Sequence, residues 1–132
     1  MRETRTVFAV YVWEQPPRKS GAAHFFAAAG YSLGGLRRLA RESAFRQELA
    51  LILGLVLLLL IFRASPAEIL GLLVLGCLLV AVEALNTALE VLVDHLSPGW
   101  SQFAKETKDL GSLAVACAVG ATVLYAGIVL FL

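Results

Sequence analysis

Five polar residues recur along one segment at spacings that place them on one side of an α-helix. They are Glu83, Asn86, Thr87, Glu90 and Asp94, and the residues between them are leucine, valine and alanine. At about 100° per residue, these spacings keep the five side chains on one narrow helix face. Ionisable groups on an otherwise apolar helix usually mark a site or pathway, so this polar stripe is the first candidate for chemistry.

The acids of the polar stripe repel one another, and a bound cation would relieve that repulsion. Mg²⁺ suits the stripe because it takes oxygen ligands, keeps several waters and accompanies substrate phosphates. Burial and neighbouring negative charge favour the protonated form of a carboxyl group, which suits a base that works near neutral pH. A structural stripe that hydrogen-bonds neighbouring helices, or extends into water, stays open at this point, most of all for Asp94.

Two shorter polar segments accompany the polar stripe. Residues 105–112 contain Lys108 and Asp109 just before an apolar run, where the start of a helix would expose backbone amides to an anion. Residues 42–48 carry acidic and basic side chains at the start of another apolar run, as is typical of a membrane interface. The known Gly-rich nucleotide-binding motifs do not occur, so any handling of ATP uses a different design.

The composition places these residues in a membrane protein. Of the 132 residues, 59% are hydrophobic and 16% are charged, whereas soluble domains carry about a quarter charged residues. Three apolar runs at residues 49–62, 69–82 and 110–132 are long enough to cross a bilayer once the polar flanks of the first two are included. The sequence therefore predicts an all-α integral membrane protein with three transmembrane helices.

The segment before the first run predicts a further helix that lies on the membrane surface. Between residues 21 and 46, apolar side chains recur at spacings of three and four among basic ones, as in an amphipathic interfacial helix. Ser65 and Pro66 predict the N-cap and first position of the second span. We expect an extension over residues 1–20, a surface helix over about 21–46, and spans over about 47–63, 67–93 and 110–132.

The distribution of charge predicts the orientation in the membrane. Most of the eleven Lys and Arg residues precede Leu49, so the positive-inside rule places the amino terminus and the second loop in the cytoplasm and the carboxyl terminus outside. The polar residues then lie at the cytoplasmic end, where ATP is available. Such a basic region suits an anionic membrane surface, and without a recognition motif we expect no nucleic-acid partner.

Several blocks of the chain resemble the prokaryotic diacylglycerol kinase and undecaprenol kinase family. The family signature, Glu-x-x-Asn-Ser/Thr-Ala-Ile/Leu-Glu followed by Val-Asp, stands at residues 83–90 and 93–94. The other matching blocks are Gly-Tyr-Ser at residues 30–32, Ala-Phe-Arg-Gln-Glu at 44–48 and Lys-Asp, before an alanine-rich span, at 108–109. The resemblance begins at about Ala28 and continues to the carboxyl terminus.

The resemblance implies a fold, a reaction and a set of site residues. It implies a homotrimer in the bacterial inner membrane whose kinase domain, residues 21–132, transfers the γ-phosphate of MgATP to the hydroxyl of the membrane lipid diacylglycerol, giving phosphatidic acid. It implies that Glu83 is the catalytic base and that Glu42 and Glu90 hold Mg²⁺. The implied ATP contacts are Tyr31, Glu42, Glu90, Gly99, Trp100, Ser101, Lys108 and Asp109. The implied lipid contacts are His24, Ser32, Ala44, Phe45, Arg46, Gln47, Glu48, Glu83 and Ser112, with Asn86 and Asp94 in support.

Within the family, the blocks at residues 44–48 and 108–112 are similar to the diacylglycerol kinase branch. The chain departs from that branch at His24, Ala27 and Gly34, where basic residues are frequent. Undecaprenol kinase, the same chemistry on a longer lipid, therefore remains the alternative. Two other classes stay open from the residues alone: an ion or proton carrier that uses the acids as its pathway, and a non-enzymatic membrane protein whose polar stripe only joins helices.

Overall fold

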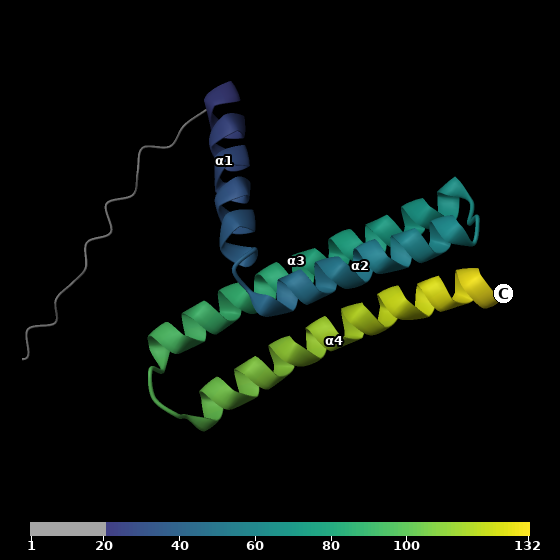
Figure 1. Cartoon of the computed structure of the whole chain (residues 1–132). Coiled ribbons are helices and arrows are strands. Elements are labelled where there is room, and N and C mark those ends of the chain that lie inside the picture. The colour runs from purple at the N-terminus through teal and green to yellow at the C-terminus, as the bar shows by residue number, and fades with distance from the viewer. Residues whose placement is uncertain (1–20) are drawn as a thin grey trace, which may run out of the picture. The chain divides into compact units, whose positions relative to one another are not determined.

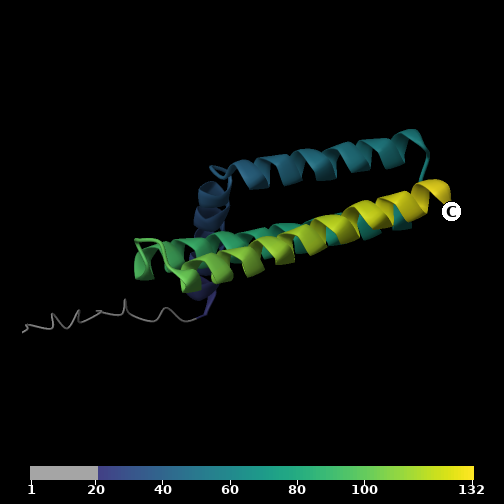
Figure 2. The ribbon, with the colours of Figure 1, turned by 90° about the horizontal axis from the view of Figure 1, so that it is seen from below.

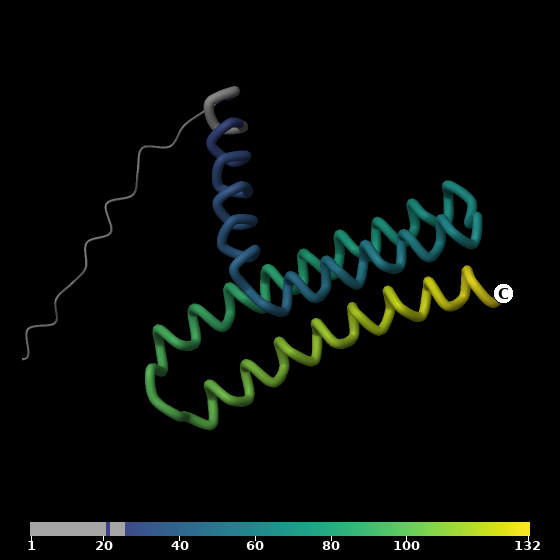
Figure 3. Tube along the Cα trace, in the orientation of Figure 1, coloured from purple at the N-terminus to yellow at the C-terminus, as the bar shows by residue number. Residues whose placement is uncertain are grey.

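The structure, a computed structural model, describes the backbone of residues 21–132 and the side chains of residues 26–132 (Figure 3). The extension predicted for residues 1–20 and the side chain of His24 lie outside the described residues. The described residues form four helices: α1 (Ala22–Leu39), α2 (Ser43–Ile61), α3 (Pro66–Leu96) and α4 (Gln102–Phe131) (Figure 1). The chain divides after Ser32 into two units, and the second contains the end of α1 and all of α2, α3 and α4.

Three of these helices are long and apolar enough to cross a membrane. The mean hydropathy of the most apolar window is 2.1 in α2 and 2.3 in both α3 and α4. No strand occurs between residues 21 and 132. The all-α fold class and the three spanning helices predicted from the apolar runs are therefore confirmed.

The turn between α2 and α3 is closed by a capping box. The hydroxyl of Ser65 accepts a hydrogen bond from the backbone N–H of Glu68 at 3.4 Å, and the Glu68 carboxylate accepts one from the backbone N–H of Ser65 at 2.6 Å. Pro66 fills the first helical position, where a missing N–H is harmless. The predicted cap is confirmed, and it fixes α2 and α3 as a tight hairpin.

The apolar core of the bundle lies beside this capped turn. Leu59, Leu72 and Ala126 are almost fully buried against one another. The hydroxyl of Tyr125 donates a hydrogen bond to the backbone oxygen of Glu68 at 3.0 Å and so ties α4 to the start of α3. Figures 1 and 2 show the carboxyl end of α4 at the same end of the bundle as the α2–α3 turn. The polar residues lie toward the opposite end of the bundle.

Two predicted boundaries differ from the observed helices. The hydroxyl of Ser101 accepts a hydrogen bond from the backbone N–H of Ala104 at 3.1 Å, so α4 begins at Gln102 rather than near residue 110. Lys108 and Asp109 therefore lie inside α4, and the prediction that they stand at a helix start with free amides is wrong. Residues 102–109 are polar but helical, because hydropathy marks the edge of the lipid and not the end of a helix.

The predicted surface helix also ends early. α1 stops at Leu39 and α2 starts at Ser43, so residues 40–42 interrupt the helix expected to run to about residue 46. The Arg46 guanidinium donates to the backbone oxygens of Arg41 at 2.9 Å and Ala40 at 3.3 Å. These bonds satisfy two carbonyl groups of the connection between the two helices and so hold it in place.

Candidate functional site

The polar stripe of α3 faces the interior of the bundle. Glu83 and Thr87 are buried, with 3% and 7% of their surfaces exposed, and Asn86 and Glu90 are half-buried. Asp94, at the end of the stripe, is exposed. Apolar residues on the other faces of α3, such as Leu85, point outward. The helical period thus turns the polar side chains toward α2 and α4 and the leucines toward lipid.

α2 contributes further carboxylates to this region. Glu48 is 6% exposed, and its charge interacts with that of Glu83 on α3. Glu42, the N-cap residue of α2, and Glu90 on α3 also lie close enough to act on Glu83 through their charges. Glu42 forms an ion pair with Arg38. Glu83 therefore interacts through its charge with three other carboxylates, two of them from the first residues of α2 and its N-cap.

The described side chains do not balance the negative charge of this region. Among the side chains that the structure describes, Glu48, Glu83 and Glu90 form no ion pair with Lys, Arg or His. Glu48 Oε2 and Asn86 Oδ1 are buried without a hydrogen-bond partner. Buried charges that lack a partner are strongly unfavourable. The site therefore favours a cation other than those that the described side chains supply.

The available ligands fit a divalent cation that also binds substrate. No group of three or more His, Cys, Asp or Glu side chains in the described part of the chain is arranged to hold a metal ion by itself. Mg²⁺ commonly binds through one or two carboxylates and completes its shell with waters and substrate phosphates. The oxygen-only donors here, with one amide oxygen left unpaired, suit that kind of shared site.

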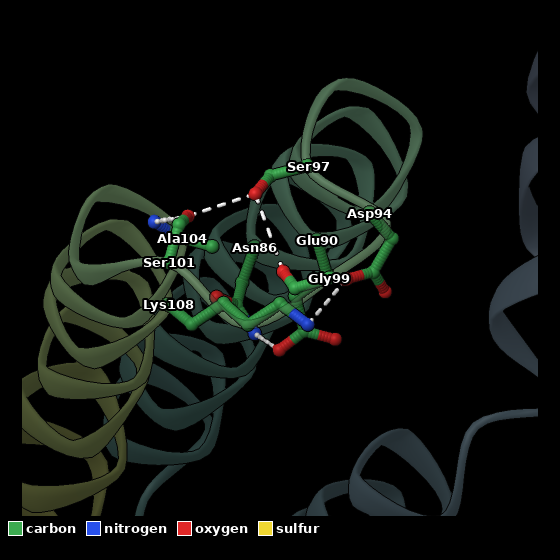
Figure 4. Close-up of polar contacts among 8 residues, drawn as sticks. All are labelled: Asn86, Glu90, Asp94, Ser97, Gly99, Ser101, Ala104 and Lys108. Carbon is green, nitrogen blue, oxygen red and sulfur yellow. Dashed lines mark hydrogen bonds and ion pairs between the residues drawn. The ribbon is translucent and has the colours of Figure 1, made fainter.

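Lys108 links α4 to the end of the polar stripe. Its Nζ atom lies 2.5 Å from Asp94 Oδ1, while Asn86 donates a hydrogen bond to Glu90 at 3.2 Å (Figure 4). Asp109 pairs instead with Lys105, at 2.5 Å on the same helix. The polar residues of α3 and the predicted nucleotide contacts of α4 are thus brought together at one end of the bundle.

Hydrogen bonds of two serines, Ser97 and Ser101, stabilise the loop between α3 and α4. The hydroxyls of Ser97 and Ser101 lie 2.8 Å apart, and the Ser97 hydroxyl donates to the backbone oxygen of Gly99 at 3.3 Å (Figure 4). Trp100 is 84% exposed and contributes no packing to the bundle. Of the three loop residues predicted to contact ATP, Ser101 also caps α4.

The residues predicted to contact lipid lie in different environments. Ala44, Gln47, Glu48, Leu51 and Val119 line a crevice of about 260 Å³ between α2 and α4, so the first three are brought together. Phe45 is buried among the helices, and Arg46 is engaged with backbone oxygens. Ser112 is exposed. Tyr31 and Ser32 belong to the first unit, where Tyr31 is exposed and the Ser32 hydroxyl donates to the backbone oxygen of Ala28 at 3.2 Å.

Gly111 belongs to the site for a reason that the sequence analysis missed. It is buried on α4, and a Cβ atom there would overlap Asn86 Oδ1. The absent side chain lets Asn86 lie against α4 while its amide donates to Glu90. The available signal was a glycine inside a helix, which lowers helix stability by about 1 kcal/mol relative to alanine and needs a packing reason.

We expect Gly111→Ala to lower the turnover of the reaction that this site performs by about a hundredfold. The new methyl group displaces the Asn86 amide, and a shift of about 1 Å in a reacting geometry has an effect of this size. Gly120→Ala on the same helix is the matched control, because a Cβ there meets nothing within 4 Å. Turnover measured for both purified variants checks the expectation, and equal activity in the two would contradict it.

Comparison with known proteins identifies relatives of this chain. The sequence model of the family described as prokaryotic diacylglycerol kinase matches residues 30–130. A diacylglycerol kinase of Sinorhizobium sp is 42% identical over 112 residues, which cover 85% of this chain and 82% of the relative. The diacylglycerol kinase of Escherichia coli (strain K12) is 35% identical over 102 residues, covering 76% and 83% of the two chains. That of Haemophilus influenzae is 31% identical over 118 residues, covering 86% and 98%.

The family match spans all three membrane helices and the whole polar stripe. It selects the enzyme among the classes that the residues alone left open, because the family and these relatives are described as diacylglycerol kinases. The expectation drawn from the signature at residues 83–94 is confirmed. This chain belongs to the prokaryotic diacylglycerol kinase family and is a bacterial membrane-embedded lipid kinase.

Proposed function

We propose that the protein transfers the γ-phosphate of MgATP to the hydroxyl of diacylglycerol, producing phosphatidic acid. The observation that carries this proposal is the group of four carboxylates that includes Glu83. Three of them, Glu48, Glu83 and Glu90, have no cationic partner among the described side chains. A triphosphate that arrives with a divalent cation would neutralise such a group. The names of the curated relatives supply the lipid, diacylglycerol.

The proposed metal site consists of Glu42 and Glu90. Glu42 stands at the N-cap of α2 and Glu90 on the polar stripe of α3, and both act electrostatically on Glu83. Mg²⁺ held by these two carboxylates would offset the charge of the phosphates. Lys108 and Asp109 of α4, with Tyr31 and residues 99–101, would contact the nucleotide. Asn86 holds the Glu90 carboxylate in place through its amide.

Glu83 is the proposed base. Phosphoryl transfer needs mainly positioning and charge neutralisation, and the residue that accepts the proton of the attacking hydroxyl must lie within hydrogen-bond reach of it. Glu83 is buried, and its charge interacts with those of the proposed metal ligands and of Glu48. The lipid would occupy the region of residues 44–48, next to the crevice between α2 and α4, with His24, Ser32 and Ser112 as further contacts.

The proposed assembly is a homotrimer in the bacterial inner membrane. The amino terminus and the active site would face the cytoplasm, which holds ATP, and the carboxyl terminus would lie outside. Three helices form a thin bundle, and many large apolar side chains on them are exposed, among them Leu53, Leu57 and Leu124. Lipid and neighbouring copies of the chain would cover these residues.

A direct lipid assay tests this proposal. Purified protein is incubated with radiolabelled ATP and Mg²⁺ in mixed micelles that contain either diacylglycerol or undecaprenol. We expect labelled phosphatidic acid from diacylglycerol and little product from undecaprenol. Labelling of undecaprenol alone would assign the chain to the other lipid, which the departures at His24, Ala27 and Gly34 leave open. No labelled lipid in either arm would contradict the proposal.

A further inference from the structure

Two acids at the end of the polar stripe, Glu90 and Asp94, are candidate partners of Lys108. Lys108 contacts Asp94, the one at the end of the stripe. Glu90 and Asp94 lie one helical turn apart on the same face of α3. Lys108 pairs with Asp94 at 2.5 Å and forms no ion pair with Glu90 (Figure 4). The second lysine of α4, Lys105, is paired with Asp109. Glu90 therefore has no ion-pair partner among the described side chains, although a lysine stands close by.

The pairing with Asp94 does not serve mainly to stabilise the fold. The Lys108 side chain is 41% exposed and that of Asp94 is 63% exposed. Exposed ion pairs contribute only about 0 to 1 kcal/mol to stability. The pair instead determines where one ammonium group lies, because the two acids are about 6 Å apart along the helix. An ammonium group on Glu90 would occupy the oxygens that a divalent cation needs.

We propose that Asp94 is a positioning residue that holds Lys108 away from Glu90. Glu90 then stays free for a divalent cation, and the Lys108 ammonium stays one turn away, where it faces the phosphates that accompany the cation. This inference rests on the proposed function, since it takes Glu90 as a metal ligand. The two acids of the polar stripe then have different roles: the half-buried Glu90 binds the cation, and the exposed Asp94 binds the lysine.

The test uses three variants of the full-length protein. Asp94→Asn removes the partner of Lys108 and keeps the side-chain shape, whereas Asp94→Glu keeps a carboxylate. Glu106→Gln is the matched control for the loss of one negative charge. Glu106 lies on α4 at the same end of the bundle, and its carboxylate accepts a hydrogen bond from Gln102 at 2.7 Å and pairs with no lysine among the described side chains.

The main measurement is binding of Mn²⁺, a spectroscopic substitute for Mg²⁺, in the presence of a non-hydrolysable ATP analogue. Free Mn²⁺ is followed by electron paramagnetic resonance. We expect Asp94→Asn to weaken Mn²⁺ binding roughly tenfold, as loss of a residue that supports a metal ligand does. The KM for MgATP should rise by a similar factor, while kcat at saturating MgATP and the thermal unfolding midpoint stay near their original values. Asp94→Glu and Glu106→Gln should behave as the original protein does.

Three results would overturn the inference. Unchanged Mn²⁺ affinity and KM in Asp94→Asn, with normal binding in the original protein, would remove the role of Asp94 and leave the proposed function intact. A lowered unfolding midpoint and equal loss of binding in Asp94→Asn and Asp94→Glu would assign Asp94 a structural role instead. No Mn²⁺ or nucleotide binding by the original protein would overturn both this inference and the proposed function.

Discussion

The Glu83→Gln variant is expected to fold and to bind MgATP but to lose lipid kinase turnover by a factor of about 10² to 10⁴, the usual contribution of a general base. Glutamine has nearly the same shape as glutamate and cannot accept the proton. Because Glu83 is buried beside other carboxylates, the loss of its charge relieves repulsion and should not destabilise the bundle. Turnover and nucleotide binding, measured on the same preparation, check this expectation.

The Glu83→Asp variant tests whether the base needs only a carboxylate or also the full length of the glutamate side chain. It keeps the charge but withdraws the oxygens by one methylene group, so we expect activity between that of the original protein and that of Glu83→Gln. If Glu83→Gln phosphorylated diacylglycerol at a rate close to that of the original protein, Glu83 would not be the base.

The Glu90→Gln variant is expected to lose affinity for MgATP rather than the proton-transfer step. A glutamine oxygen still accepts the hydrogen bond that Asn86 donates at 3.2 Å, so the polar stripe keeps its arrangement. The charge that attracts the cation is gone, and even loss of an outer partner of a metal ligand weakens binding by about 10- to 100-fold. Binding of a fluorescent ATP analogue at several Mg²⁺ concentrations measures the change.

The pair of variants is more informative than either alone. Glu83→Gln should retain Mg²⁺-dependent nucleotide binding but lose turnover. Glu90→Gln should need far more Mg²⁺ than the original protein, both for nucleotide binding and for turnover. If Glu90→Gln bound nucleotide at the same Mg²⁺ concentration as the original protein, Glu90 would not be a metal ligand, and the inference on Asp94 would fail with it.

The local features of this protein could be predicted from the sequence because each depends on residues close together in the chain. Three apolar runs predict three spanning helices, and the spacing from Glu83 to Asp94 predicts one polar face. Ser65 followed by Pro66 predicts a helix start, which the capping box with Glu68 confirms. These patterns need only the helical period and the chemistry of a few neighbouring residues.

The features that depend on helix register could not be predicted in this way. Whether Lys108 contacts Glu90, Asp94 or Asp109 depends on where α4 starts, and Ser101 starts it well before the apolar run. The burial of Glu48 likewise depends on how α2 packs against its neighbours. The sequence around Glu48 is typical of a membrane interface and so does not predict a buried side chain. The contact between Gly111 and Asn86 requires α3 and α4 to be aligned to within one turn.

The central physical claim is that the buried carboxylates around Glu83 are tolerated because a divalent cation and a triphosphate neutralise them. Equilibrium titration of the purified protein with ATP, with Mg²⁺ present or removed by a chelator, tests this claim most directly. The claim predicts saturable ATP binding in Mg²⁺ and at least about tenfold weaker binding in chelator. ATP binding of equal strength in both conditions, or no binding in either, would contradict it.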